Sequence, residues 1–266
     1  MSFTTFDVPG VFLFGTGGGI DPAGTVTGSY LDANFVVHGF LRAPDGTITT
    51  IDAPGAGAFP SGGTWAFGIN PQGTVAGCYI DNSNVGHGFV RNRKGTLTAF
   101  DVPDSTNLSC AGDYGELPFG SSIVGINPAG AITGAAFEPS ENLLGGNYRG
   151  FLRGKDGTFT TFDAVPSPSS PCCTWTFGIA INPAGVIAGY DNDFESVNHG
   201  FVRATDGTVT ILDAPGAGTG SLQGTIALAI NPAGQVTGEY ADENSGQHGF
   251  LWTPWCKGGE RGPGNK

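Results

Sequence analysis

The sequence predicts an all-β protein, a five-bladed β-propeller of four-stranded blades in which an N-terminal strand completes the last blade. Three observations predict this fold. The 266 residues include 47 glycines and 18 prolines, too many for a helical protein, while 39% hydrophobic residues are ample for a core. A unit of about 50 residues, the size of one propeller blade, recurs along the chain. The last copy lacks one strand, and the first residues of the chain match the missing piece.

Each copy is marked by a turn motif, Ile-Asn/Asp-Pro-x-Gly, followed four residues later by a second glycine. Proline at the second turn position and glycine at the fourth are typical of a type I turn. The residue before the isoleucine is always small, which suits inner strands that crowd around a narrow axis. The second glycines lie 49, 57, 55 and 49 residues apart, at Gly28, Gly77, Gly134, Gly189 and Gly238.

The second copy shows the expected elements in order. Its first strand is predicted over Trp65–Ile69 and its second over Thr74–Ile80. The third is predicted over His87–Arg91 and the fourth over Thr96–Val102, and every segment is short and bounded by turns. The predicted blades cover about 15–54, 64–103, 121–166, 176–215 and 225–254 plus 2–9, in a single domain over 2–254, with a flexible tail over 255–266.

The fifth copy stops after its third strand, at His248–Trp252. The segment Phe3–Pro9 matches the fourth strand of the first copy, Ile48–Pro54. We therefore expect the N-terminal segment to become the outer strand of the last blade, so that no blade keeps an unpaired inner edge. An open solenoid would not explain such a displaced repeat.

The repeat resembles a known family at three points: Gly-Ile-Asn-Pro-x-Gly, then His-Gly-Phe, then Asp-Gly-Thr-x-Thr-x-x-Asp. It is similar to the bacterial HAF-type extracellular repeats, in which a His-Ala-Phe triplet takes the place of His38-Gly39-Phe40. The likeness covers residues 2–254 and implies an exported protein. The fold is also similar to that of five-bladed sugar-acting hydrolases and, more loosely, six-bladed calcium-dependent lactonases, without a motif match.

Charge and hydropathy exclude several classes of partner. Eleven basic and 23 acidic residues give a net charge of −12, which repels nucleic-acid phosphates and anionic lipid surfaces and disfavours anionic substrates. No apolar run reaches the roughly 20 residues of a membrane span. We expect a soluble protein, most simply a monomer, that is extracellular or periplasmic if a signal peptide was removed; none is visible in this chain.

The chain has five cysteines, without the spacing of a zinc site. Cys110, Cys172 and Cys173 fall in long connections, where a disulfide could join neighbouring blades of an exported protein. The pairing stays open at this point.

Each copy except the third carries a histidine before Gly-Phe. An aspartate stands at the end of each outer strand, next to this position. These pairs could be general bases. However, catalysis needs one such pair, whereas this one recurs around the ring, so the structural interpretation is preferred: a hydrogen bond that ties strands together. The set comprises His38, His87, His199 and His248 with Asp7, Asp52, Asp101, Asp163 and Asp213.

The third copy breaks this symmetry. Arg149 replaces the histidine, and the longest insertions lie nearby, at 103–121 and 138–148. A ring must depart from symmetry where it binds an asymmetric ligand. Glu138, Arg149 and Asp193 are therefore the catalytic candidates, although Arg149 could simply pair with Asp163.

A carboxylate also follows each second glycine by four residues, at Asp32, Asp81, Glu138, Asp193 and Asp242. Aspartate here can accept hydrogen bonds from loop amides. In the fourth copy Asp191, Asn192, Asp193 and Glu195 gather within five residues, a spacing that calcium favours. The alternative is a solvated acidic loop.

Two functions remain open. One is a calcium-assisted hydrolase of a small neutral ester, lactone (N-acyl homoserine lactones included) or glycoside, in which the ion polarises the carbonyl or positions water. The other is a non-catalytic module that binds a glycan or a partner. Trp65 and Trp175, each entering a first strand from the loop side, could stack on a sugar or acyl chain or pack between blades.

Overall fold

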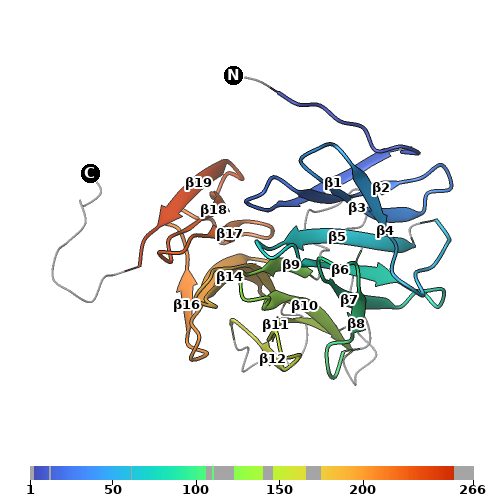
Figure 1. The fold of residues 1–266 in the computed structure, drawn as a ribbon. Coiled ribbons are helices and arrows are strands. Elements are labelled where there is room, and N and C mark those ends of the chain that lie inside the picture. Colours follow the sequence, from blue (N-terminus) through green and yellow to red (C-terminus); the bar gives the residue numbers. More distant parts are fainter. Residues whose placement is uncertain are drawn as a thin grey trace.

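The computed structural model describes residues 3–11, 13–60, 62–105, 110, 123–139, 146–165 and 175–254 (Figure 1). This part of the chain consists of strands, turns and loops. It contains no helix, and therefore none that is long and apolar enough to cross a membrane. The expected all-β class is confirmed, and the two large curled sheets fit a propeller-like fold.

The strands follow one another along the chain in antiparallel units. Unit 1 contains β1(Leu13–Ile20), β2(Val26–Leu31), β3(Val37–Arg42) and β4(Ile48–Ile51). Unit 2 contains β5(Gly63–Ile69), β6(Val75–Ile80), β7(Gly86–Arg91) and β8(Leu97–Phe100). Unit 3 contains β9(Ile123–Ile126), β10(Ile132–Pro139), β11(Gly146–Arg153) and β12(Phe159–Phe162). Unit 4 contains β13(Trp175–Ile181), β14(Ile187–Asn192), β15(Asn198–Arg203) and β16(Val209–Leu212). Unit 5 contains β17(Gly224–Ile230), β18(Val236–Ala241) and β19(Gln247–Trp252).

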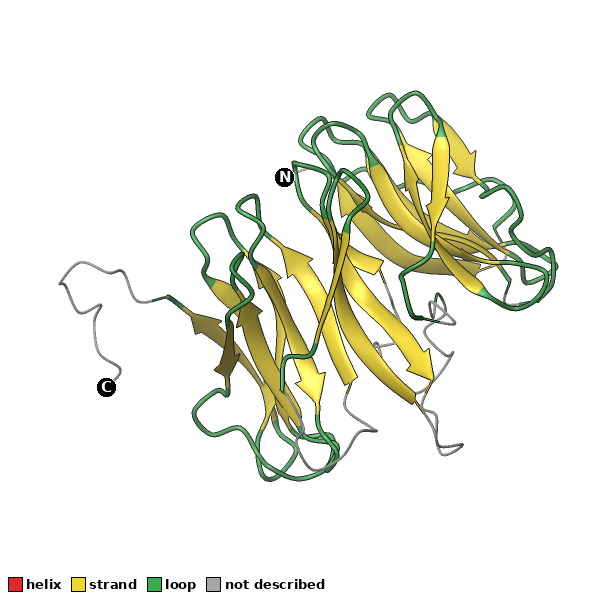
Figure 2. Ribbon diagram, turned by 90° about the horizontal axis from the view of Figure 1, so that it is seen from below, coloured by secondary structure: helices red, strands yellow, loops and turns green. Residues whose placement is uncertain are grey.

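The units differ in how they are joined. A single parallel bridge links the third strand of one unit to the first strand of the next: Val37 to Gly63, Tyr148 to Trp175, and Asn198 to Gly224. Units 1 and 2 thereby form one sheet, and units 3 to 5 form the other. Figure 2 shows the strands of both sheets running between two loop-bearing ends.

The hydrophobic core lies between consecutive units. In each case the end of one unit's fourth strand packs on the next unit. Ile51 and Ala53 lie against Ala66 and Phe89, and Phe162 lies in one cluster with Phe201. Val102 joins Trp65 of its own unit and Phe151 of unit 3 in the same way. Trp65 is only 8% exposed and fills this inter-unit core, so of its two predicted roles the packing between units is the one observed.

Two series of hydrogen bonds also repeat between units. The hydroxyl of a threonine on the first strand accepts the N–H of an alanine from the preceding unit: Thr64 from Ala53 (2.9 Å), Thr176 from Ala164 (3.1 Å) and Thr225 from Ala214 (2.9 Å). At the opposite ends of the strands, the turn asparagines donate in sequence to the next turn's carbonyl: Asn70 to Asn127 (3.2 Å), Asn127 to Asn182 (3.3 Å) and Asn182 to Asn231 (3.3 Å).

The N-terminal segment does not pair with the last unit in this structure. Residues 3–8 have no strand geometry, and no described residue pairs with the outer side of β19. The segment instead packs on unit 1, where Val8 is buried with Tyr30 and Phe40. The final unit thus has three strands in the described part of the chain.

Candidate functional site

The two ends of the strands define two faces of the molecule. We call the end that carries the loops between second and third strands, together with the connections between units, the connection face. The opposite end, with the tight turns after first and third strands, is the turn face. Most of the residues singled out in the sequence lie on the connection face.

Three histidines on the connection face, His38, His87 and His199, each lie between two carboxylates. The Nδ1 of each meets the aspartate at the end of the fourth strand: 2.7 Å for His38 and Asp52, 2.6 Å for His87 and Asp101, and 3.0 Å for His199 and Asp213. The Nε2 of each faces the aspartate after the second strand: Asp32 at 3.8 Å, Asp81 at 3.6 Å and Asp193 at 3.4 Å. A tyrosine stacks on the imidazole in three units, namely Tyr30, Tyr79 and Tyr240.

His248 departs from this pattern. Its Nε2 lies 3.0 Å from Asp242, but its Nδ1 has no partner among the described residues, and Asp7 is not placed beside it. The side chain is 45% exposed, against 22 to 26% for the other histidines. Unit 5 therefore lacks the carboxylate that a fourth strand supplies elsewhere.

Unit 3 keeps the geometry with arginine in place of histidine. The Arg149 Nε donates to Asp163 at 3.0 Å, and Nη1 lies 3.4 Å from Glu138. Burial by itself would lower the pKa of Arg149, but the hydrogen bond and charge of Asp163, followed by those of Glu138, raise it. Glu138 and Arg149 are thus brought together, while Asp193 belongs to the neighbouring unit.

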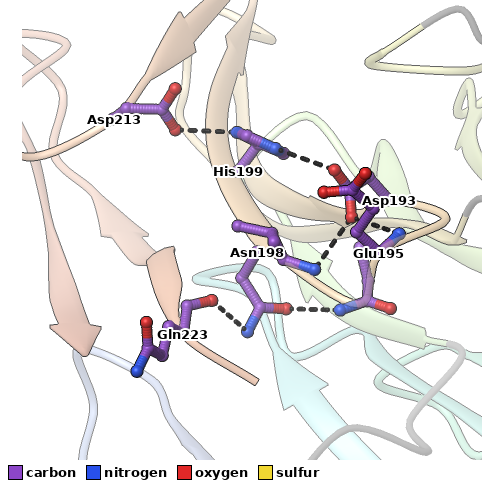
Figure 3. A network of polar contacts seen from close by, with 8 residues as sticks. Asp193, Glu195, Asn198, His199, Asp213 and Gln223 are labelled. Atoms are coloured by element: carbon purple, nitrogen blue, oxygen red, sulfur yellow. Dashed lines mark hydrogen bonds and ion pairs between the residues drawn. The ribbon is translucent and has the colours of Figure 1, made fainter. Parts of the chain in front are cut away.

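The carboxylates after the second strands bind loop amides. Asp193 Oδ1 accepts the N–H groups of Glu195 (2.9 Å) and Val197 (2.8 Å), and its other oxygen faces His199 (Figure 3). Asp32, Asp81 and Asp242 hold the same loop in their units. For Asp32 and Asp81, a backbone hydrogen bond is the main cause that lowers the pKa.

The four residues predicted as calcium ligands have different surroundings. Successive side chains of a strand point to opposite faces. Asp191 is fully buried, Asn192 donates to Asn198 (3.0 Å), and Asp193 holds its loop, while Glu195 is exposed. In the described ranges, no three His, Cys, Asp or Glu side chains are grouped so that they could share an ion.

Asp191 is the unusual carboxylate of unit 4. It occupies the position of the tyrosines that stack on histidine elsewhere, directly opposite His199 in the ladder. Its Oδ1 accepts the Thr176 hydroxyl, and its Oδ2 is buried without a partner in the described structure. Burial raises the pKa of Asp191 to about 6, although Thr176 and the charge of His199 act against this shift.

This shift predicts a pH-dependent stability. A carboxyl whose folded pKa is raised from 3.8 to about 6 favours the folded state below pH 4 and loses that contribution as pH rises through 6. The loss between pH 5 and pH 8 amounts to about 1–2 kcal/mol. Denaturant unfolding across this range should show the slope in the wild type and a smaller slope in Asp191→Asn, in which the contribution of His199 remains.

Glu195→Gln is the matched control, because Glu195 is exposed in the adjacent loop and the slope should persist. His199 contributes in the same direction at higher pH. Burial opposes its protonation, but the hydrogen bonds and charges of Asp213 and Asp193 raise its pKa. An unchanged slope in Asp191→Asn would contradict the assignment to Asp191.

Exposed aromatic rings accompany the polar groups of unit 4. Trp175 opens β13 and is 40% exposed, with Tyr148 packed edge-on at 6.0 Å. Phe194, in the loop that Asp193 holds, is 67% exposed. Trp175 was singled out in the sequence, but Phe194 was not, since a single aromatic residue in a polar loop carries no pattern.

The described part of the chain contains one disulfide. Cys110 forms a disulfide with Cys78, not with Cys172 or Cys173. Cys78 lies inside the regular strand β6, so the sequence offered no reason to single it out. Cys172, Cys173 and Cys256 lie outside the described residues.

Comparisons with known proteins give little help. No family model matches the chain, and no curated protein matches it. Among solved structures it is similar to a triple arginine-to-alanine mutant of AofleA from Arthrobotrys oligospora, with 14% identity and a TM-score of 0.45 over 92% of this chain and 86% of that one. This likeness is too distant to carry an argument about function.

Proposed function

We propose that the protein binds a neutral carbohydrate at the connection face of unit 4. The observation that carries this proposal is the pair of exposed rings, Trp175 and Phe194, at the end of the same unit that presents Asp193, Glu195 and His199. Sugars offer apolar C–H faces that pack on aromatic rings and hydroxyls that bond to carboxylates and imidazoles. The strand and loop hydrogen bonds hold these groups in place before a ligand arrives, which limits the entropic cost of binding.

The regular part of the connection face supports binding more than catalysis. A histidine or arginine side chain between two carboxylates recurs in units 1 to 4, and it ties the second, third and fourth strands together. A general base is needed once, whereas a framework contact is needed in every unit. Unit 4 differs from this framework in having Asp191 in place of a stacked tyrosine and Trp175 at its entrance.

A calcium-assisted hydrolase of a neutral ester or lactone is the second candidate. The observation that favours it is Asp191, a buried carboxyl beside His199. The pKa of Asp191, about 6, is suited to proton transfer near neutral pH. Because Asp191 is fully buried, it would have to act through the partly buried His199 or Asp193 and not on the substrate itself.

The binding proposal predicts that Trp175→Ala and Phe194→Ala each weaken carbohydrate binding about tenfold or more, since ring truncation removes a stacking surface. A glycan array would first identify a neutral ligand, and isothermal titration calorimetry would then measure affinity. Phe35→Ala is the matched control, an exposed aromatic on the same face of unit 1. We expect it to leave affinity unchanged.

Two results would overturn this function. One is unchanged affinity in both unit 4 variants. The other is turnover of simple lactones that added calcium supports and a chelator abolishes, which would favour the hydrolase. The same lactone panel, run on the wild-type protein, therefore separates the two candidates.

We further propose that the units are blades of a five-bladed propeller that the N-terminal segment closes. The segment already lies against unit 1 as a preceding fourth strand would. The Arg42 guanidinium sits 4.8 Å over the Phe6 ring. In the same way, the Arg153 guanidinium lies 4.7 Å from the centre of the Phe100 ring, and the Arg203 guanidinium lies 4.8 Å from the centre of the Phe162 ring. Each ring belongs to the fourth strand of the preceding unit.

The free side of unit 5 supports the same closure. Ile20 of unit 1 is 68% exposed, whereas its equivalents Ile69 and Ile181 are each 9% exposed. Leu251 on β19 is 69% exposed. The turn asparagines of units 2 to 4 each donate to the carbonyl of the next unit's turn, whereas the side-chain amide of Asn231 in unit 5 donates to Gln235 of its own unit. Closure would cover these apolar groups and place Asp7 near the Nδ1 of His248.

An extracellular or periplasmic location belongs to this proposal as well. The Cys78–Cys110 disulfide supports it, since disulfides persist in oxidising compartments.

A further inference from the structure

A cleft on the turn face has no role in the proposed carbohydrate site. It has a volume of about 360 Å³ and lies at the boundary between units 2 and 3. Its walls are the tight turns of both units, and they include Gln72, Thr96, Thr98, Arg153 and Lys155. The connection face, with its acidic residues, is at the other end of these strands (Figure 2).

Two cations, Arg153 and Lys155, line this cleft. Every described lysine and arginine except Arg149 lies at a turn between third and fourth strands. Units 2 and 3 carry most of them, with Arg91, Arg93 and Lys94 on one turn and Arg153 and Lys155 on the next. The only acidic residue on these two turns is Asp156. A chain of net charge −12 thus presents a local basic surface here.

Arg153 is held in a defined position. Its guanidinium lies 4.7 Å from the Phe100 ring and 5.9 Å from the Phe159 ring, and Nη1 donates to the Gly154 carbonyl at 3.3 Å. Its Nε is buried without an acceptor in the described structure. The Oδ1 of Asp156 accepts the backbone N–H and the hydroxyl of Thr158 (3.0 and 2.7 Å), so Asp156 acts on Arg153 through its charge and not through a hydrogen bond.

Uncharged polar groups complete the lining. The side chains of Gln72, Thr96 and Thr98 form no hydrogen bond within the described part of the chain, and Lys155 is exposed and has no ion-pair partner there. Donors that are not used inside the protein are available to a ligand with several oxygens.

We propose that this cleft binds an anionic sugar. The carboxylate or phosphate of the ligand accepts hydrogen bonds from Arg153 and Lys155, because charge-assisted hydrogen bonds to these cations are the strongest contacts that the cleft can provide. The ligand's hydroxyls meet Gln72, Thr96 and Thr98. This site lies on the opposite face from the proposed neutral-carbohydrate site and does not depend on it.

The test is calorimetric titration of the full chain with glucuronate, glucose 6-phosphate, glucose and inorganic phosphate. We expect both sugar anions to bind, with affinity that falls as salt rises. Lys155→Glu should weaken binding about tenfold or more, since it replaces an attractive contact by a repulsive one. Lys155 is exposed, so this variant should fold normally.

Thr205→Glu is the matched control, because Thr205 occupies the position of Lys155 in unit 4, outside the cleft lining. It should leave affinity within about twofold. Glucose binding as tightly as glucuronate would overturn the anionic part of the proposal, and inorganic phosphate binding as tightly as glucose 6-phosphate would overturn the sugar part. Unchanged affinity in Lys155→Glu would overturn the location. Trp175→Ala, which tests the other face, should not alter any of these titrations.

Discussion

Replacing Gly189 by alanine is expected to destabilise the folded protein by about 3 kcal/mol or more, because the added methyl has no space. Gly189 lies on β14 opposite Gly178, where the ladder between β13 and β14 contains a bulge. A Cβ at this position would overlap the Phe177 carbonyl oxygen and lie 3.0 Å from the Phe201 ring. Backbone cannot yield as a flexible side chain can, and both partners belong to the core of unit 4.

Gly10→Ala separates this overlap from the conformational cost of losing a glycine. Gly10 has a φ of +84°, yet nothing lies within 4 Å of a Cβ built there. Its replacement should lower the free energy of unfolding by only about 1 kcal/mol, because alanine is strained in the left-handed conformation. Denaturant unfolding of both variants gives the comparison, and similar losses for the two would show that steric overlap at Gly189 is not the cause.

Gly249→Ala is expected to destabilise the protein by about 1–3 kcal/mol if the N-terminal segment closes the ring as proposed. The equivalent glycines face the fourth strand of their own unit. A Cβ on Gly150 would meet the Phe162 ring at 2.5 Å, and one on Gly200 would meet the Leu212 carbonyl at 2.9 Å. Phe6 would take that place beside Gly249. Without closure, a Cβ on Gly249 has only one contact, at 3.8 Å.

A cross-link tests the same closure directly. Leu41 pairs with Thr49 in unit 1, so the repeat places Thr4 opposite Leu251. The double variant Thr4→Cys with Leu251→Cys should therefore oxidise within one chain. Leu41→Cys with Thr49→Cys is the positive control, because that pair is formed in the structure. A neutral Gly249→Ala together with no intramolecular cross-link would rule out the closed ring, and a cross-link between two chains would indicate strand exchange.

The sequence predicted the strands closely because their determinants are local. The turn motif starts and stops strands through the fixed φ of proline and the free φ of glycine. The predicted strand Trp65–Ile69 appears as Gly63–Ile69, and His87–Arg91 as Gly86–Arg91. The Asn70 carbonyl accepts the Gly73 N–H at 2.8 Å, as such a turn requires.

The candidate site was only partly predictable. The repeat spacing led to the histidines and to Asp193, because each recurs at one position of a copy. Asp191 stood out in the sequence because it departs from the repeat. Its complete burial could not be predicted, since strand alternation and the packing of neighbouring units decide which carboxylate is buried. Phe194 had no equivalent in other copies and gave no signal.

By itself, the sequence determined the repeat, the strand and turn pattern and the all-β class, since these depend on residues near one another in the chain. Tertiary structure alone decided which distant residues meet. It paired Cys78 with Cys110, buried Trp65, and placed the turn residues Arg153 and Lys155 of unit 3 beside the turns of unit 2 in one cleft. Such contacts depend on how the units stack, because side chains far apart in sequence share an environment only after the backbone has brought them together.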